Sequence, residues 1–437
     1  MALMNLYQQF TSVIEDYLLP SSRIVLAFSG GVDSRVLLSL LAQYQQQTGR
    51  ECLTVHVHHG LSINADNWAE RCKSWAFESG IPFVKEQVQL DLKGQSIEAC
   101  AREARYQALS HHVQEGDILI TGQHADDQLE TFLLALKRGS GPKGLAAMAE
   151  SKPFSQGQLV RPLLQARRYD IESYAHQHGL SWVEDESNQD IRFDRNYIRH
   201  QVSPVLEQRW PHFSQALHRS AQLCAEQEQL LDELLSDKFS QVLNSDNSLS
   251  IEGMSELSSL TRARLIRMWF ANMQLRMPSR EHLEQIWTQV ALAKHDANPE
   301  INLAPVQVRR FNQKLYLVPE QQDISQWKSQ IELGNRVELP DQLGHLILRS
   351  SSDGGLSLSA LAAAPLAVIF NPEGLVAHPA QRGHSRKLKK LFQEYQIPSW
   401  QRRRMPILMC GEQVAAIADL FIDHQFIGQD CELIWDK

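Results

Sequence analysis

Short runs of consecutive apolar residues alternate with segments of helical periodicity in the first half of the chain. Strands are predicted at 24–28, 52–58, 81–88 and 117–121, and the first two of them are expected to be buried. Between them, apolar positions recur every three or four residues, which is typical of amphipathic helices. Because strands that alternate with helices form parallel βαβ units, we predict a doubly wound α/β domain over residues 1–212, with a fifth strand at 181–183.

The pattern changes after residue 212. Long helical stretches at 214–236 and 261–292, followed by a segment that alternates as a β-hairpin does at 306–318, predict a mainly helical domain over residues 213–320. Residues 321–344 are polar and are interpreted as a linker. Residues 345–437 are expected to form a small α/β domain.

Composition limits the class of protein. The 437 residues are enough for two or three domains, and no apolar run is long enough to cross a bilayer. The N-terminus shows no basic region followed by an apolar run, so we expect no secretion signal. The six cysteines are scattered without a C-x-x-C pair, which argues against a zinc knuckle or a redox pair and predicts a cytoplasmic location. With a net charge of −8, binding to nucleic acid must come from local basic patches.

The turn after the first strand is rich in groups that hold phosphate. Its sequence is Ser29-Gly30-Gly31-Val32-Asp33-Ser34, and a helical pattern follows. The glycines allow backbone N–H groups to converge, the serines add hydroxyl donors, and the helix points its positive end at the same place. An ordinary glycine-rich turn is the alternative, but the buried strand before it and the helix after it favour a phosphate site.

This turn resembles the PP-loop of the ATP pyrophosphatases, which split ATP between its alpha and beta phosphates. The resemblance implies a Rossmann-like fold. It also implies that ATP is held by Ser29, Gly30, Gly31, Val32, Asp33 and Ser34.

A second polar segment, His124-Ala-Asp126-Asp127-Gln-Leu-Glu130, follows the fourth strand. The carboxyl ends of parallel strands meet at one edge, so this segment, the Ser29 turn and 56–59 are expected to share a crevice. Asp126 and Asp127 precede Glu130 by four and three residues, which places all three carboxylates on one helix face. They suit Mg²⁺ or an amine, whereas favourable contact with the helix dipole is the plainer reading.

The motifs taken together resemble the tRNA(Ile)-lysidine synthetase family, over essentially the whole chain. They are Ser29–Ser34, His56–Ser62, His124–Thr131, Arg138–Gly141, Asp185–Asp190 and Asp194–Arg199. The chain departs from the family at His58, where Asn or Asp is frequent, and at Ser62, where Arg is frequent.

The resemblance implies a ligase that modifies the wobble cytidine of isoleucine tRNA with a CAU anticodon. ATP adenylates the oxygen on carbon 2 of cytosine, and the ε-amine of free L-lysine then displaces AMP to give lysidine. ATP and Mg²⁺ are the implied cofactors. The partners are the tRNA, free lysine and, since family members are often dimers, a second copy of the chain.

Roles for single residues follow from that reaction. The expected catalytic residues are Asp33, Arg105 and His124, with Asp33 and Asp126 as metal ligands and with Asp127, Glu130 and Asp190 binding lysine. Lysine must attack as a free amine although its ordinary pKa is about 10.4, so deprotonation at pH 7 costs roughly 4–5 kcal/mol. His124 is expected to accept that proton. For Arg105, a solvated helix face is the alternative.

A basic stretch near the C-terminus predicts RNA binding. Residues 382–404 carry eight Lys or Arg residues against one acid, with Phe392 and Trp400 between them. The resemblance implies contact with the tRNA acceptor stem. The expected tRNA-binding residues are Arg195, Arg199, Lys389, Arg402 and Arg403. Residues 137–144 are expected to be a basic flexible loop in which glycines and a proline exclude a helix.

Two other functions remain open at this point. A tRNA thiolase of the PP-loop superfamily would need cysteines for sulfur transfer or an iron–sulfur cluster, and the scattered cysteines argue against it. A non-catalytic RNA-binding protein would leave the cluster from His124 to Glu130 without a purpose. Lysine- and tRNA-dependent release of AMP from ATP separates the three functions.

Overall fold

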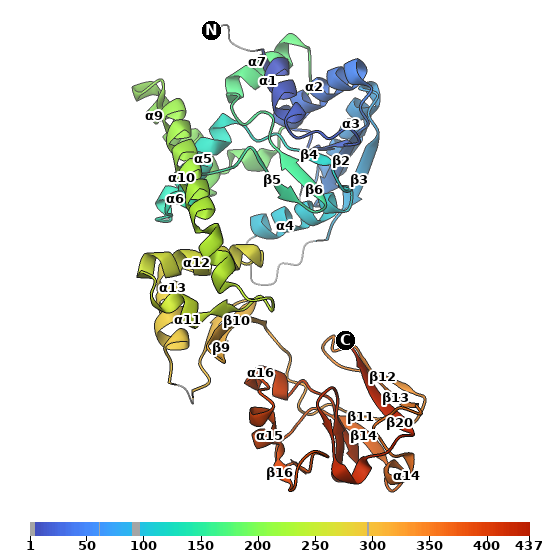
Figure 1. The fold of residues 1–437 in the computed structure, drawn as a ribbon. Coiled ribbons are helices and arrows are strands. Elements are labelled where there is room, and N and C mark those ends of the chain that lie inside the picture. Colours follow the sequence, from blue (N-terminus) through green and yellow to red (C-terminus); the bar gives the residue numbers. More distant parts are fainter. Residues whose placement is uncertain (1–4, 61, 90–96, 295–296) are drawn as a thin grey trace. The chain divides into compact units, whose positions relative to one another are not determined.

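The computed structural model describes residues 5–60, 62–89, 97–294 and 297–437 (Figure 1). The chain divides into two compact units, Met1–Glu233 and Leu234–Lys437. Each unit has its own buried core and is described by itself.

A six-stranded sheet in the order β3-β2-β1-β4-β6-β5 forms the centre of the first unit. Its strands are β1 (Ile24–Ala27), β2 (Cys52–His58), β3 (Phe83–Gln87), β4 (Ile118–Ile120), β5 (Ser151–Phe154) and β6 (Gly157–Val160). Neighbouring strands run parallel except for β5 and β6, which form an antiparallel hairpin. The predicted doubly wound sheet is confirmed.

Helices cover both faces of this sheet, as the unbroken apolar strands predict (Figure 1). One face packs on α1 (Leu6–Glu15), α2 (Val32–Thr48), α3 (Ala65–Glu78) and α7 (Arg168–Gln177). The other face packs on α4 (Ile97–Ser110), through Leu109 and the adjoining Val113. Residues 24–26 of β1 are fully buried between these two layers.

The order of the strands creates the crevice. After β1 the chain adds β2 and β3 on one side, then returns to place β4 on the other side of β1. The loops that leave β1 and β4 therefore diverge, and ligands of doubly wound sheets bind at such a switch point. The PP-loop follows β1, and α5 (Ala125–Lys137) follows β4.

Two local predictions are wrong. Residues 181–183 are not a strand of the sheet, because the backbone N–H of Val183 donates instead to the carbonyl of Gly30 in the PP-loop, at 2.9 Å. The fifth and sixth positions of the sheet are filled by β6 and β5, which form a hairpin. The basic loop does contain a short helix, α6 (Pro142–Leu145), because Pro142 stands at the start of the helix, where its missing N–H costs nothing.

The rest of the first unit is helical. It comprises η1 (Glu186–Gln189), α8 (Asp194–Tyr197), η2 (Ile198–Val202), α9 (Ser203–Arg209) and most of α10 (Phe213–Val242). Helices α5 and α10 pack together with η2 through Leu129, Ile198 and Leu217. Neither the 30-residue α10 nor any other helix in the described ranges is long and apolar enough to cross a membrane.

The second unit begins with a small helical layer over a sheet. The helices are α11 (Ile251–Ser255), α12 (Ser259–Asn272), α13 (Arg280–Gln285) and η3 (Ile286–Ala291), and they pack through Trp269 and Phe270. The sheet, in the order β7-β10-β9-β8, consists of β7 (Leu249–Ser250), β8 (Glu300–Leu303), β9 (Val306–Phe311) and β10 (Lys314–Pro319). The predicted hairpin turns at Asn312 and Gln313, both with positive φ.

Two larger sheets and one two-stranded sheet lie in the C-terminal part of the described chain. One is β11 (Lys328–Gln330), β14 (Leu366–Ile369), β17 (Ile407–Cys410), β18 (Gln413–Ile417) and β19 (Phe421–Ile422). The other is β12 (Arg336–Glu338), β13 (His345–Ser350) and β20 (Cys431–Asp436). Smaller elements are α14 (Leu358–Leu361), β15 (Val376–Ala377), β16 (Arg386–Lys387), α15 (Leu388–Glu394), α16 (Ser399–Arg402) and η4 (His424–Phe426). The segment expected to be a linker thus contributes β11 and β12 to these sheets.

Leu26→Ala tests the importance of the central strand. Leu26 is fully buried in β1, so its truncation should lower the free energy of unfolding of the first unit by about 3 kcal/mol. Leu136, which is 55% exposed on α5, provides the matched control, and Leu136→Ala should change the stability little. Urea unfolding followed by tryptophan fluorescence measures both. Equal effects of the two substitutions would contradict this packing.

Candidate functional site

The PP-loop is closed by its own serines. Gly30 has a φ of +88°, and its N–H donates to Ser34 Oγ at 3.0 Å. Ser34 Oγ donates to the Gly31 carbonyl at 3.0 Å and lies 3.1 Å from Ser29 Oγ. The chain therefore curls over the start of α2, with Gly31 as the residue that precedes the helix. This geometry presents backbone donors and a helix N-terminus to an anion.

Close neighbours hold the loop in place. A Cβ atom on Gly30 would lie 2.7 Å from Cys72 Sγ, and one on Gly122 would lie 3.1 Å from Asp33 Cβ and 3.3 Å from the Ser34 nitrogen. Gly122, in the loop after β4, thus packs tightly on the PP-loop, and a side chain there would push against Asp33 and the Ser34 backbone. Its role was not visible in the sequence, because it depends on contact between two separate strands.

His124 lies at the centre of a group of carboxylates. It precedes α5 and is 2% exposed. Its Nε2 atom lies 3.7 Å from Asp33 and 3.5 Å from Asp127, and its Nδ1 atom lies 3.4 Å from Asp126. Burial alone would lower the pKa of His124, but the carboxylates of Asp127, Asp126 and Asp33 outweigh burial and raise that pKa. The imidazolium form is therefore favoured at this position.

Glu130 is held by two arginines. Its carboxylate is 1% exposed and accepts from Arg199 Nε at 2.6 Å and from Arg199 Nη2 at 3.1 Å. Arg195 Nε lies 3.0 Å from the same group, and Arg199 Nη2 also donates to Asp127 at 3.2 Å. Burial raises the pKa of Glu130, and the arginines offset this only in part. Arg195 and Arg199, expected at the tRNA, thus lie against two acids expected to bind lysine. Their four-residue spacing is the one sequence signal for this arrangement.

Arg168 is a site residue that the sequence did not reveal. Its Nη1 atom donates to both carboxylate oxygens of Asp33, at 3.0 and 3.2 Å. Its backbone N–H donates to Asp126 at 2.9 Å, and its Nε atom donates to Glu172 at 2.7 Å. The neighbouring Arg167 instead pairs with Asp170. Nothing in the local sequence distinguishes these two arginines.

The remaining predicted residues lie at the margin of this cluster or outside it. Arg105 Nε donates to His59 Nε2 at 3.2 Å, at the end of β2. Burial, together with the charge of Arg105, lowers the pKa of His59 to about 4, so His59 is neutral at pH 7. Asp190 pairs with Arg192 at 2.7 Å, and within the described ranges no contact joins it to Asp127 or Glu130.

The carboxylates fit a magnesium ion only in combination with a nucleotide. In the part of the chain that the structure describes, no group of three or more His, Cys, Asp or Glu side chains is arranged to hold a metal ion by itself. Mg²⁺ usually takes one or two carboxylates and completes its shell with water and phosphate oxygens. Asp33 and Asp126 provide two such carboxylates beside the PP-loop, with side-chain exposures of 24% and 41%.

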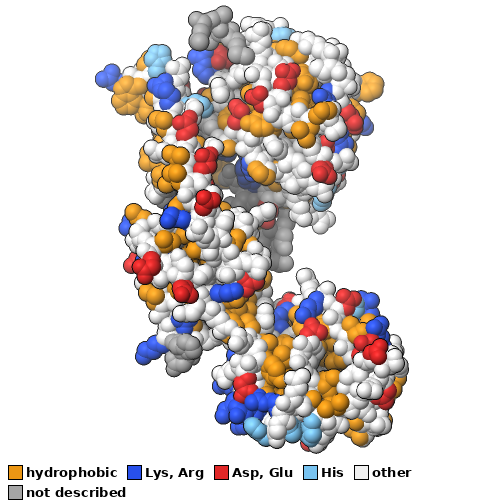
Figure 2. Space-filling model, in the orientation of Figure 1, with side chains coloured by type: hydrophobic (Ala, Val, Ile, Leu, Met, Phe, Trp, Pro, Cys, Tyr) orange, Lys and Arg blue, Asp and Glu red, His pale blue; other side chains and the backbone are white. Residues whose placement is uncertain are grey.

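The basic residues of the C-terminal stretch differ in how freely they are displayed. Arg382 and Arg386 pair with Glu394, Arg403 with Glu373 and Arg404 with Asp341. Arg402 Nε donates to the carbonyl of Ile397 at 2.9 Å. Lys387, Lys389 and Lys390 are exposed. Figure 2 shows a group of Lys, Arg and His side chains on this part of the molecule.

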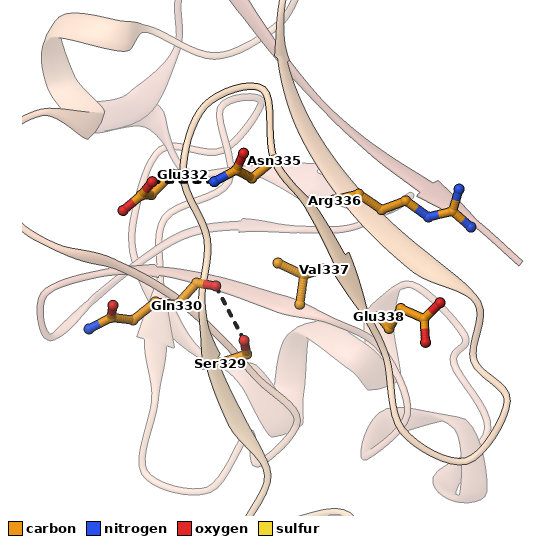
Figure 3. A pocket seen from close by; sticks show the side chains of 7 residues that line it. All are labelled: Ser329, Gln330, Glu332, Asn335, Arg336, Val337 and Glu338. Carbon is orange, nitrogen blue, oxygen red and sulfur yellow. Dashed lines mark hydrogen bonds between the residues drawn. The ribbon is translucent and has the colours of Figure 1, made fainter.

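A hollow in the second unit contains none of the predicted site residues. It has a volume of about 480 Å³ and is lined by Ser329, Gln330, Glu332, Asn335, Arg336, Val337 and Glu338 (Figure 3). Hydrogen bonds link Ser329 to the Gln330 carbonyl and Asn335 to Glu332 within the same stretch. It is an open surface between β11 and β12 without a cluster of catalytic groups.

Known families match three parts of the chain. Residues 3–206 match a PP-loop domain, residues 249–316 a TilS substrate binding domain and residues 366–436 a TilS substrate C-terminal domain. The tRNA(Ile)-lysidine synthase of Vibrio vulnificus (strain YJ016) is 58% identical over 433 residues, which cover 99% of both chains. That of Vibrio atlanticus (strain LGP32) is 55% identical over 454 residues, covering 99% of this chain and all of the relative.

A solved structure of a U34-tRNA thiolase from Methanococcus maripaludis, with its 4Fe-4S cluster, is a distant likeness. It is 17% identical with a TM-score of 0.43, and the match covers 51% of this chain and 78% of the thiolase. This similarity is too low to bear on the activity.

The electrostatics of His124 predict a pH-dependent contribution to stability. Because the folded pKa lies above the ordinary 6.5, the stabilisation is fully present below pH 6.5 and is lost as the pH rises through the raised value. It amounts to about 1.4 kcal/mol for each unit by which the pKa is raised. His124→Gln should therefore destabilise the protein more at pH 5.5 than at pH 9.

Urea unfolding at both pH values measures this difference. His111→Gln, which removes a surface histidine from the same unit, is the matched control. A loss for His124→Gln that is the same at both pH values would contradict the proposed charge on the imidazole.

Proposed function

The chain belongs to the tRNA(Ile)-lysidine synthase family, and we propose that it joins free L-lysine to the wobble cytidine of isoleucine tRNA with a CAU anticodon, with ATP as the activating reagent. The full-length identity of 58% carries this conclusion. The meeting of the PP-loop and the cluster from His124 to Glu130 at one switch point provides a suitable site. The chain is thus an ATP-dependent carbon–nitrogen ligase.

In the first half-reaction the PP-loop binds the departing diphosphate. The cytidine O2 oxygen attacks the alpha phosphorus of ATP. The bond between the alpha phosphorus and the oxygen that bridges it to the beta phosphate breaks, and pyrophosphate leaves. Residues 29–34 supply hydroxyl and backbone donors for that pyrophosphate. Arg105, held by His59 at the end of the neighbouring strand, supplies positive charge to the alpha phosphate.

Asp33 and Asp126 are the proposed ligands of magnesium. When bound, Mg²⁺ would neutralise the phosphate oxygens as pyrophosphate leaves. The two carboxylates lie beside the PP-loop and on either side of His124. These carboxylates would bind the cation, while the glycines and serines of the PP-loop would bind the phosphates.

In the second half-reaction the acids bind lysine and the histidine takes up its proton. The neutral amine attacks carbon 2 of the cytosine, the bond from carbon 2 to the adenylated oxygen breaks, and AMP leaves. Asp127 and Glu130 are proposed to attract the ammonium group, and Asp190 is proposed to join them after release from Arg192. Because Glu130 is 1% exposed and Arg199 bonds to both of its oxygens, direct contact with the amine requires that arginine to move.

His124 is proposed to accept the amine proton. The transfer requires the neutral imidazole, and the neighbouring carboxylates raise the pKa of His124 toward that of an amine. Each unit of approach removes about 1.4 kcal/mol from the cost of the transfer. The cluster therefore tunes a base as well as binding a cation.

Binding of tRNA is proposed to use both units. Lys389, Arg402 and Arg403 belong to the stretch that the family resemblance places at the acceptor stem. Arg195 and Arg199 would contact tRNA near the reacting base, in addition to their bonds with Glu130. We also propose a cytoplasmic location, where all six free thiols would persist. A homodimer is proposed on the family resemblance alone.

Transfer of labelled lysine tests the function directly. The purified protein with ATP should place radiolabelled L-lysine on isoleucine tRNA with a CAU anticodon and release one AMP for each lysine. Methionine tRNA with the same anticodon is the control. Release of AMP without lysine would favour another PP-loop reaction, such as thiolation, and no turnover would favour an RNA-binding protein.

Measuring the two half-reactions separately should distinguish the residues needed for adenylation from those needed for the reaction with lysine. Asp33→Ala should abolish adenylation, because it removes a carboxylate beside the departing phosphates. Glu130→Ala should allow the adenylated tRNA to form but block its reaction with lysine. Trapping the adenylate without lysine, then adding lysine, measures each step. Equal losses of both steps in the Glu130 variant would reject its role in lysine binding.

Salt dependence should report the contribution of the basic stretch. Neutralising Arg402 and Arg403 together should weaken tRNA binding and flatten the plot of log affinity against log salt, because fewer counterions are released. Arg349→Gln, which removes a surface arginine paired with Glu432 in the same domain, is the control. An unchanged slope in the double variant would show that these arginines do not face the tRNA.

A further inference from the structure

One residue holds both of the proposed magnesium ligands. The guanidinium of Arg168 bonds to both oxygens of Asp33, and its backbone N–H bonds to Asp126. Arg168 is the first residue of α7, so a single helix start brings a positive charge and a backbone donor to the two carboxylates. A cation that binds Asp33 must therefore compete with Arg168.

The guanidinium has a second acidic partner on its own helix. Glu172, one turn further along α7, accepts from Arg168 Nε at 2.7 Å, while Nη1 points to Asp33. The two bonds use different nitrogen atoms of one planar group. After loss of the Asp33 bond the arginine would still be paired with Glu172. This loss would therefore cost less free energy than leaving the guanidinium without any acidic partner.

We propose that Arg168 is a positioning residue that acts as an internal counter-ion of Asp33 and gives up this carboxylate when a divalent cation arrives. The inference rests on the proposed function only in taking Asp33 as a metal ligand. While the site lacks a cation, the arginine balances a carboxylate that stands beside His124 and two further acids. When the cation binds, Glu172 retains the arginine.

This arrangement gives the free protein a weak affinity for cations. A metal ion that arrives without nucleotide must displace Arg168, and in return it gains bonds to only one or two carboxylates. A metal ion that arrives on ATP gains phosphate ligands as well, while the PP-loop binds the phosphates. Displacement of the counter-ion costs the same for both cations, and the additional phosphate ligands offset that cost only for the nucleotide-bound one.

Binding of Mn²⁺ without nucleotide tests the proposal. Mn²⁺ replaces Mg²⁺ as a probe, and electron paramagnetic resonance of free Mn²⁺ gives the dissociation constant for the full-length protein. Arg168→Gln should bind Mn²⁺ at least five times more tightly than the unaltered protein, because the competing charge is gone. General damage to the site would weaken binding, so the direction of the change is diagnostic.

Arg167→Gln is the matched control. It removes the same charge one residue away, from a side chain that pairs with Asp170. Its Mn²⁺ affinity should stay within a factor of two of the unaltered protein. If both variants gain affinity equally, the effect is one of net charge and the proposal fails. It also fails if Arg168→Gln binds Mn²⁺ no more tightly than the unaltered protein, including the case in which neither binds it.

Two further variants cover other outcomes. Glu172→Gln removes the alternative partner and should weaken Mn²⁺ binding, because the displaced arginine then lacks a charged neighbour; tighter binding would contradict the two-partner arrangement. Should Arg168→Gln not fold, Arg168→Lys serves instead, since one ammonium replaces two separate guanidinium bonds and should give a smaller gain. No gain in this variant would overturn the proposal.

Failure here is distinguishable from failure of the proposed function. If the unaltered protein transfers labelled lysine but Arg168→Gln binds Mn²⁺ no more tightly than the unaltered protein, the ligase function stands and the counter-ion role of Arg168 is rejected. Tighter Mn²⁺ binding in Arg168→Gln without any lysine transfer by the unaltered protein would retain the counter-ion and reject the ligase.

Discussion

Balance of buried charge is the constraint on which this site depends. Asp33, Asp126, Asp127 and Glu130 meet at the switch point, and Arg168, Arg195, Arg199 and His124 lie within ion-pair distance of them. Removing the partners of the buried His124 or Glu130 leaves an unpaired charge in a poorly solvated place, which costs far more than the pair contributes. The charged side chains around His124 come from α2, α5, α7 and the turn from α8 to η2. These elements must therefore pack at defined positions relative to one another.

A balanced set of charges is also one that can exchange partners. In the proposed reaction, a lysine ammonium group replaces an arginine beside Asp127 or Glu130, and a cation on ATP replaces Arg168 beside Asp33. Each exchange substitutes one positive charge for another, so it avoids the cost of uncovering a bare carboxylate. The PP-loop needs no such exchange, since its donors are backbone and hydroxyl groups that Ser34 already orders. If the proposed roles hold, the carboxylates that bind substrate are the ones that the arginines and His124 stabilise in the folded protein.

The sequence predicted the parts of this site that have local causes. Buried apolar runs predicted β1, β2 and β4, the edge strand β3 was also predicted, and the PP-loop followed from glycines and serines between a strand and a helix. Contacts between distant segments were not predictable. Arg167 and Arg168 are neighbours that each have an acid three or four residues ahead, and only the docking of α7 against the PP-loop brings Arg168 to Asp33. Likewise, Val183 looked like part of a strand, but its backbone N–H closes on Gly30. Asp190 fitted a family motif, yet its carboxylate is taken by Arg192.

A crystal structure with L-lysine and an ATP analogue that cannot be cleaved between the alpha and beta phosphates tests the central claim most directly. The exchange of partners within a balanced cluster predicts that the lysine Nζ atom lies within hydrogen-bond distance of Asp127 or Glu130. It also predicts that Arg199 has moved away from the carboxylate that the amine occupies. A lysine bound elsewhere, with Glu130 still bonded to Arg195 and Arg199 and with Asp127 still bonded to Arg199, would contradict the account.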